Sequence, residues 1–140
     1  MKIYFACSIT GGRQDVSAYQ RIVQHLKDQG HEVPTEILAD PGVLSLEIVV
    51  DPVEVYERDT AWIRESDFLI AEVSTPSHGV GYEIAYALGL GKTVMCVHKK
   101  DKPVSKMITG NRSPQLIVKS YNSEMELTGL LDEFIAQQIA

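Results

Sequence analysis

The sequence predicts an α/β fold in three layers, with a parallel sheet of about five strands, of Rossmann-like or flavodoxin-like type. The run at 67–73 is apolar at most successive positions, which is typical of a strand buried on both faces of a parallel sheet. A loop with one proline and two glycines follows at 74–81, then a helical pattern at 82–90 and a second apolar run at 93–97. This order of strand, loop, helix and strand predicts the α/β class. The length of 140 residues predicts one domain over residues 1–140.

The first half of the chain predicts two strands with a helix between them. Residues 2–6 are β-branched and aromatic, as in a strand. Residues 14–29 place apolar side chains at helical spacing before a terminating glycine. A short, polar second strand is expected at 31–35, toward an edge of the sheet. Residues 36–50 are the least regular part, although the stretch at 44–50 is apolar enough for an extra helix or a lid.

The second half adds further helices and a last strand. Three- and four-residue steps predict a helix at 52–65 and place Asp59 on its apolar stripe, so we expect this aspartate to face inward. A short helix is expected at 104–108 and a last strand at 115–119. The closing helix at 123–139 begins with a serine followed three residues later by a glutamate, which is the spacing of a capping box.

The composition limits which binding partners and which cellular compartment can be expected. The net charge of −6 argues against a nucleic-acid polymer, because binding to its backbone needs clustered basic residues. A small anion can still be held by backbone N–H groups. No apolar run approaches a span of ~18 residues and no signal peptide is recognisable, so no membrane partner is expected. The two cysteines form no CxxC pair and the four histidines form no cluster. We therefore expect free thiols, no metal and a cytoplasmic location.

Glu83 is the sharpest chemical feature of the central unit. The helical pattern places it in the first turn of the helix after the loop. There the helix dipole and free N–H groups favour an ionised carboxylate, so a low pKa is expected. Such a group suits a nucleophile or a stabiliser of a cationic transition state. The alternative is a glutamate that only complements the dipole.

Asp59 and Tyr4 are candidate partners of Glu83. A buried aspartate is costly unless it is paired or functional. Two carboxylates around a sugar are the usual equipment for glycosidic cleavage. Alternatively, Asp59 pairs with Arg58 or Arg64. Tyr4 could present a hydroxyl at the mouth of the cleft or simply pack within its strand.

Two loops have the composition of anion-binding loops. Residues 8–13 (SITGGR) connect a strand to a helix, where glycines, a serine hydroxyl and helix N–H groups can hold a phosphate. Ser77, Gly79 and Gly81 give the second loop the same character. The first loop matches neither GxGxxG nor GxxxxGK[ST]. A plain turn that closes a strand–helix unit remains the alternative.

Three segments together resemble a known family: IYFACSITGGR (3–13), ERDTAWIRESDFLIAEVSTPSHGVGYEIAYALGLGK (57–92) and VSKMITG (104–110). They are similar to the 2′-deoxynucleoside 5′-monophosphate N-glycosidases of the nucleoside 2-deoxyribosyltransferase superfamily, and AEVSTPSHGVGYE is specific to that group. The resemblance covers most of the chain in order. It implies one domain of this type and hydrolysis of a nucleoside 5′-monophosphate to a free base and (deoxy)ribose 5-phosphate. No cofactor or metal is implied.

The resemblance also implies roles for individual residues. Glu83 matches the catalytic glutamate, which attacks or stabilises C1′, and Asp59 matches the aspartate that assists departure of the base. Tyr4 matches a tyrosine of the sugar site and favours 2′-deoxy substrates. The implied substrate-binding residues are Ser8, Ile9, Gly11, Gly12 and Arg13 in the first loop, Ser77 and Gly79 in the second, and Ser105 and Met107 from a partner subunit.

A homodimer with shared sites is therefore implied. The chain departs from the family pattern at Cys7, where glycine is common, and at Thr10, where a basic residue is common. The loss of that cation could weaken phosphate affinity or alter the preferred substrate.

Three other functions remain open at this point. A nucleoside 2-deoxyribosyltransferase would exchange bases through the same glutamate, without a 5′-phosphate. A ribonucleotide N-glycosidase would act on CMP or a similar substrate, although Tyr4 argues against it. A non-catalytic nucleotide-binding module would bind without releasing a base.

Overall fold

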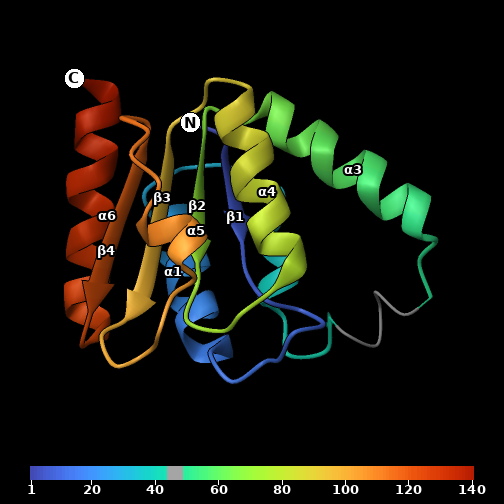
Figure 1. Cartoon of the computed structure of the whole chain (residues 1–140), viewed down its shortest axis with the longest axis horizontal. Coiled ribbons are helices and arrows are strands. Elements are labelled where there is room, and N and C mark those ends of the chain that lie inside the picture. Colours follow the sequence, from blue (N-terminus) through green and yellow to red (C-terminus); the bar gives the residue numbers. More distant parts are fainter. Residues whose placement is uncertain (44–48) are drawn as a thin grey trace.

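The protein is an α/β fold with helices on both faces of a parallel sheet (Figure 1). A computed structural model describes residues 1–43 and 49–140. Within these residues, four parallel strands form one sheet in the order β1-β2-β3-β4. The strands are β1 (Ile3–Ala6), β2 (Phe68–Glu72), β3 (Val94–Lys99) and β4 (Leu116–Tyr121). The helices are α1 (Val16–Asp28), the 3-10 helix η1 (Glu36–Ala39), α3 (Pro52–Glu65), α4 (His78–Gly89), α5 (Lys106–Thr109) and α6 (Glu124–Ile139). The predicted fold class is confirmed.

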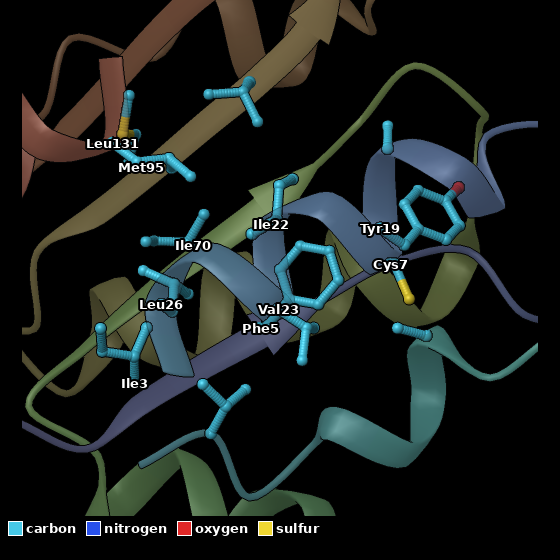
Figure 2. Packing of buried hydrophobic residues seen from close by; sticks show 14 of the residues in the cluster. Ile3, Phe5, Cys7, Tyr19, Ile22, Val23, Leu26, Ile70, Met95 and Leu131 are labelled. Carbon is cyan, nitrogen blue, oxygen red and sulfur yellow. The ribbon is translucent and has the colours of Figure 1, made fainter. Parts of the chain in front are cut away.

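Alternation along β1 divides the core into two layers. Ile3 and Phe5 point to the face covered by α1 and α6, where Phe5 packs against Tyr19 with ring centroids 6.1 Å apart (Figure 2). Tyr4 and Ala6 point to the opposite face, covered by α3 and α4. Because successive side chains of a strand face opposite ways, this alternation brings Tyr4 beneath α4.

The fifth predicted strand, at 31–35, is not present. This segment makes a single parallel bridge, between Lys2 and Glu32. Pro34 has no N–H to donate to a ladder. The Thr35 hydroxyl instead accepts from the Phe5 N–H at 3.0 Å and donates to the Phe5 carbonyl at 2.8 Å. A side chain thus takes over the bonds that a strand backbone would make.

The order of segments creates a switch point between β1 and β2. The 31–35 segment lies beyond β1, whereas β2 pairs with the other edge of β1. The chain therefore leaves the carboxyl ends of β1 and β2 in opposite directions, which is where open α/β sheets bind ligands. The two candidate loops follow these two strand ends.

Most predicted helices are confirmed, but one begins earlier than predicted, and this changes the position of Glu83 within it. Helix α4 begins at His78, four residues earlier than predicted, because the Ser77 side chain caps it by accepting from the Val80 N–H at 3.3 Å. Glu83 therefore lies in the second turn of α4 rather than in the first. The predicted helix or lid at 44–50 falls largely on residues 44–48, which lie outside the described residues.

Candidate active site

Tyr4 and Glu83 meet at the switch point. The Tyr4 hydroxyl, from the middle of β1, donates a short hydrogen bond to Oε2 of Glu83. Tyr4 is fully buried and Glu83 is half-buried. Two residues 79 positions apart in the sequence are thereby joined by the packing of α4 over β1.

The surroundings of Glu83 oppose its ionisation. Burial raises the pKa of Glu83 to about 8, with a further push from the Asp59 charge, while the Tyr4 hydroxyl and Arg58 oppose the rise. The expectation of a low pKa was wrong. Its basis was a first-turn position, and dipole stabilisation falls off beyond the first turn.

Tyr4 is the donor in its hydrogen bond with Glu83. Burial raises the pKa of its phenol far above the ordinary value, and the Glu83 and Asp59 charges add to this rise. The phenol therefore keeps its proton near neutral pH.

Asp59 lies on α3 and faces the same cluster. Its side chain is only 17% exposed and accepts from Arg58 Nε at 2.8 Å, as one of the sequence alternatives proposed. Its charge raises the pKa values of both Tyr4 and Glu83. The stripe used to predict its inward position is only partly buried, since Tyr56 is 51% exposed.

The first loop packs closely against the second. A Cβ on Gly11 would lie 2.4 Å from the Pro76 carbonyl oxygen, so only glycine allows the two loops to approach this closely. Ser8 is fully buried below this contact, 3.0 Å from the same Cβ position. Its hydroxyl has no hydrogen-bond partner within residues 1–43 and 49–140. Gly12 has a φ of 135°, which disfavours any other residue.

Arg13 is used differently from the other residues of this loop. Its guanidinium donates to the carbonyls of Ser8, Leu38 and Asp40 at 2.8, 2.9 and 2.8 Å, and it stacks over Tyr19. These bonds tie the first loop to the segment around η1. Most of the donors of Arg13 are therefore directed at backbone rather than at a ligand.

The second loop forms the N-terminus of α4. The Ser77 Oγ accepts from Val80, so its own proton is available to an incoming oxygen. The N–H groups of His78 and Gly79 belong to the first turn, where donors lack intrahelical acceptors. Gly79 lies between the Ser77 hydroxyl and the Glu83 carboxyl group, because a Cβ on it would be 3.9 Å from both Ser77 Oγ and Glu83 Oε1.

A cavity of about 1010 Å³ adjoins these loops. Its lining includes Thr10, Gly11 and Ser77 of the two loops, together with Met107 of α5 and the α5 N-cap, Ser105. The cavity extends between α4 and α5, along the side of α4 turned away from Glu83. In a single chain, α5 therefore lies beside the loops rather than beside the Tyr4–Glu83 pair. Met107 is 85% exposed, an unusual fraction for a methionine.

Sequence reasoning missed two features. Arg58 was considered only as a partner that would make Asp59 structural, although its charge also acts on Tyr4 and Glu83. Glu72 was treated as part of an apolar run, yet it is a fully buried glutamate at the end of β2. A lone glutamate inside that run was the available signal. No group of three or more metal-ligating side chains is gathered within the part of the chain that the structure describes.

The family model of the nucleoside 2-deoxyribosyltransferases matches residues 3–132. The chain belongs to this family. A protein of Esox lucius named 5-hydroxymethyl-dUMP N-hydrolase is 42% identical over 140 residues, covering 96% of this chain and 95% of the relative. A protein of Methanococcoides burtonii, provisionally named 2′-deoxynucleoside 5′-phosphate N-hydrolase 1, is 43% identical over 119 residues, covering 85% of this chain and 98% of the relative.

Solved structures of the nucleoside 2-deoxyribosyltransferase type share the fold. A CMP N-glycosidase of Clostridium botulinum superposes with a TM-score of 0.74 at 21% identity, covering 96% of this chain and 99% of that structure. A 2-deoxyribosyltransferase of Bacillus psychrosaccharolyticus gives 0.64 at 19% identity, covering 91% and 90%. Among residues 1–43 and 49–140, no helix is long and apolar enough to cross a membrane.

Proposed function

We propose that this protein hydrolyses the N-glycosidic bond of 2′-deoxynucleoside 5′-monophosphates to a free base and 2-deoxyribose 5-phosphate. The observation that carries the proposal is the full-length similarity to proteins named as N-hydrolases of such nucleotides, at 42% identity over 96% of this chain in one case. The placement of Tyr4, Glu83 and Asp59 at the switch point supports it, because cleavage of a glycosidic bond calls for two carboxyl groups.

Glu83 acts at C1′ in this proposal. As the bond between C1′ and the base nitrogen breaks, its electron pair leaves with the base and C1′ becomes electron-poor. The ionised Glu83 carboxylate attacks or stabilises C1′, and a water molecule then completes hydrolysis. Because the pKa of Glu83 is about 8, the reactive form grows as the pH rises toward that value.

Tyr4 and Asp59 support the same step. Tyr4 holds Oε2 of Glu83, which leaves Oε1 on the side of Gly79, where no side chain intervenes. The leaving base gains a proton or a hydrogen bond, and Asp59 is the second carboxylate of the cluster and assists its departure. Tyr4 also lies where it can disfavour a 2′-hydroxyl.

The 5′-phosphate is held where the two loops meet. Ser8 supplies a buried hydroxyl without another partner among the described residues, and Ser77 supplies a hydroxyl proton at the N-terminus of α4. Ile9, Gly11, Gly12 and Gly79 complete the binding surface. We assign Arg13 to holding the loop in shape, which supports binding indirectly. Binding energy from the phosphate can then orient C1′ against Glu83.

We further propose a cytoplasmic homodimer in which Ser105 and Met107 complete the site of the partner. The exposed Met107 and the exposed aromatic pair Tyr56 and Tyr82 between α3 and α4 support such a contact surface. The two buried free cysteines fit a reducing compartment.

Mixed dimers test the shared site. Glu83→Ala and Ser105→Ala chains are co-refolded so that mixed dimers form. If sites are shared, one site of each mixed dimer has both native residues and base release recovers above that of either parent. If each chain supplies its own Ser105, the mixture shows only the average of the parents.

The function itself is tested by base release from dGMP, dCMP and 5-hydroxymethyl-dUMP, with GMP and CMP as ribonucleotide controls. Deoxyguanosine and deoxycytidine, with and without an acceptor base, control for the phosphate. The proposal predicts release from the deoxynucleoside monophosphates alone. Release from nucleosides only with an acceptor base would assign the chain to the transferases. Nucleotide binding without any release would make it a binding module.

A further inference from the structure

We propose that a buried polar network centred on Glu72 positions the second phosphate loop, so that Glu72 and Asp15 are positioning residues for 5′-phosphate binding. This inference rests on the proposed function. The network lies at the carboxyl ends of β2, β3 and β4. It does not include Tyr4, Glu83 or Asp59.

Glu72 fixes the start of the loop. Its Oε1 accepts from the Ser74 N–H at 2.6 Å, and its Oε2 accepts from the Ser74 hydroxyl at 3.0 Å and from the Tyr121 hydroxyl by a short bond. The Ser74 Oγ in turn accepts from the backbone N–H of Lys99 at 2.8 Å. One fully buried carboxylate thus links the ends of three strands to the first residue of the loop.

Asp15 fixes the next residue. Its Oδ2 accepts from the Thr75 hydroxyl at 2.7 Å, and its Oδ1 accepts from Lys99 Nζ at 2.6 Å. Asp15 is 1% exposed and directly precedes α1, at the end of the first loop. Lys99 joins the two sets of bonds, because its backbone N–H donates to Ser74 and its Nζ donates to Asp15, so that one network holds both loops.

The geometry separates this network from the reacting carboxylate. Residues 74 and 75 are anchored immediately before Pro76, whose carbonyl contacts Gly11, and before Ser77, which caps α4. Glu83 is held independently, by the Tyr4 hydroxyl and by the buried face of α4. Disturbing the network should therefore misplace the phosphate loop and leave the orientation of Glu83 unchanged.

The principal variant is Glu72→Gln, which keeps the shape of the side chain. An amide nitrogen in place of Oε2 would face two hydroxyl donors, so Ser74 and Tyr121 must reorient. We expect KM for the deoxynucleoside monophosphate to rise about tenfold with kcat within about twofold of the wild type. Circular dichroism and a thermal melt confirm that the variant is folded.

Two milder variants test the proposal if Glu72→Gln does not fold. Thr75→Val removes the hydroxyl that binds Asp15, and Thr128→Val on α6 removes a comparable hydroxyl, bonded to the Met125 carbonyl, away from the site. Thr75→Val should raise KM severalfold and Thr128→Val should not. A fall in kcat with unchanged KM, or equal effects of the two valines, would overturn the proposal.

A binding measurement separates this inference from the proposed function. Calorimetry with 2-deoxyribose 5-phosphate needs no turnover. Should the wild type release no base, weaker binding by Thr75→Val than by Thr128→Val would still support the network while the proposed activity fails. Equal affinities of the two valine variants, or no binding by the wild type, would overturn the positioning role.

Discussion

Glu83 on α4 and Glu72 at the carboxyl end of β2 have similar surroundings. Each accepts from a tyrosine hydroxyl, Tyr4 for Glu83 and Tyr121 for Glu72. Each also has an aspartate nearby that bonds to a cation: Asp59 with Arg58, and Asp15 with Lys99. Burial raises the pKa of both glutamates.

The two glutamates differ in what faces their remaining acceptor positions. Ser74 donates twice to Glu72 and Tyr121 donates once, and this side chain is fully buried. Glu83 receives only the Tyr4 hydroxyl among the residues that the structure describes, and Gly79 presents no side chain toward its Oε1. The comparison teaches that Glu72, which accepts from three donors, holds backbone and side chains in place, whereas Glu83 accepts from one described donor and keeps the acceptor positions that our proposal requires of a reacting group.

Replacing Asp59 with asparagine should have the largest effect of the supporting residues. We expect base release to fall about 10²-fold, at the lower end for loss of an acid–base group. Because the Asp59 charge raises the pKa of Glu83, the rising limb of kcat/KM should also move to lower pH. Measurement of kcat/KM from pH 5 to 9 checks both effects. An unchanged rate would remove Asp59 from the reaction.

Tyr4→Phe should shift the rising limb of the kcat/KM profile to higher pH. The Tyr4 hydroxyl lowers the pKa of Glu83, so its loss moves the limb above about pH 8 and reduces kcat at pH 7 about tenfold. The ratio of ribonucleotide to deoxyribonucleotide activity should rise. A limb that stays in place, with an unchanged ratio, would leave Tyr4 as a packing residue.

A serine at position 79 would make Glu83 resemble Glu72. The Cβ position lies 3.9 Å from Glu83 Oε1, close enough for a serine hydroxyl to donate to it. We expect Gly79→Ser to lower the pKa of Glu83 and to reduce kcat severalfold. Gly79→Ala fills the same space without a donor and is the matched control. If both variants give the same pH profile, the number of donors to the carboxylate does not set its pKa.

Stability should also depend on the ionisation of Glu83. The folded-state pKa of Glu83, about 8, lies above its ordinary value of 4.5, so its contribution is fully present below about pH 4.5 and declines as the pH rises to about 8. The difference in free energy of unfolding between Glu83→Gln and the wild type should therefore favour the variant more at pH 8.5 than at pH 5, by at most ~5 kcal/mol. A pH-independent difference in thermal or urea melts would contradict the raised pKa.

The sequence predicted the fold class and most helices because hydrophobic periodicity is a local property. The failure at 31–35 arose because the Thr35 side chain replaces backbone bonds with Phe5, a tertiary contact that no pattern displays. The start of α4 was misplaced because glycines at 79 and 81 read as loop, whereas the Ser77 cap extends the helix through them.

Prediction of the site had a similar limit. The residue types and the resemblance nominated Tyr4, Asp59 and Glu83, and the structure brings Tyr4 and Glu83 into contact. The raised pKa of Glu83 could not be predicted, because it depends on burial between α4 and β1 rather than on position in the helix. For Glu72, only the structure reveals the three donors that surround it.

The most direct test compares Glu83→Gln and Glu72→Gln in one assay of base release from a saturating deoxynucleoside monophosphate. Our account predicts that Glu83→Gln loses at least about 10³-fold in kcat while it still binds the nucleotide. Glu72→Gln should keep kcat within about twofold of the wild type once the nucleotide saturates it. Wild-type turnover by Glu83→Gln would show that Glu83 is not the reacting group. A larger loss of kcat in Glu72→Gln than in Glu83→Gln would show the same.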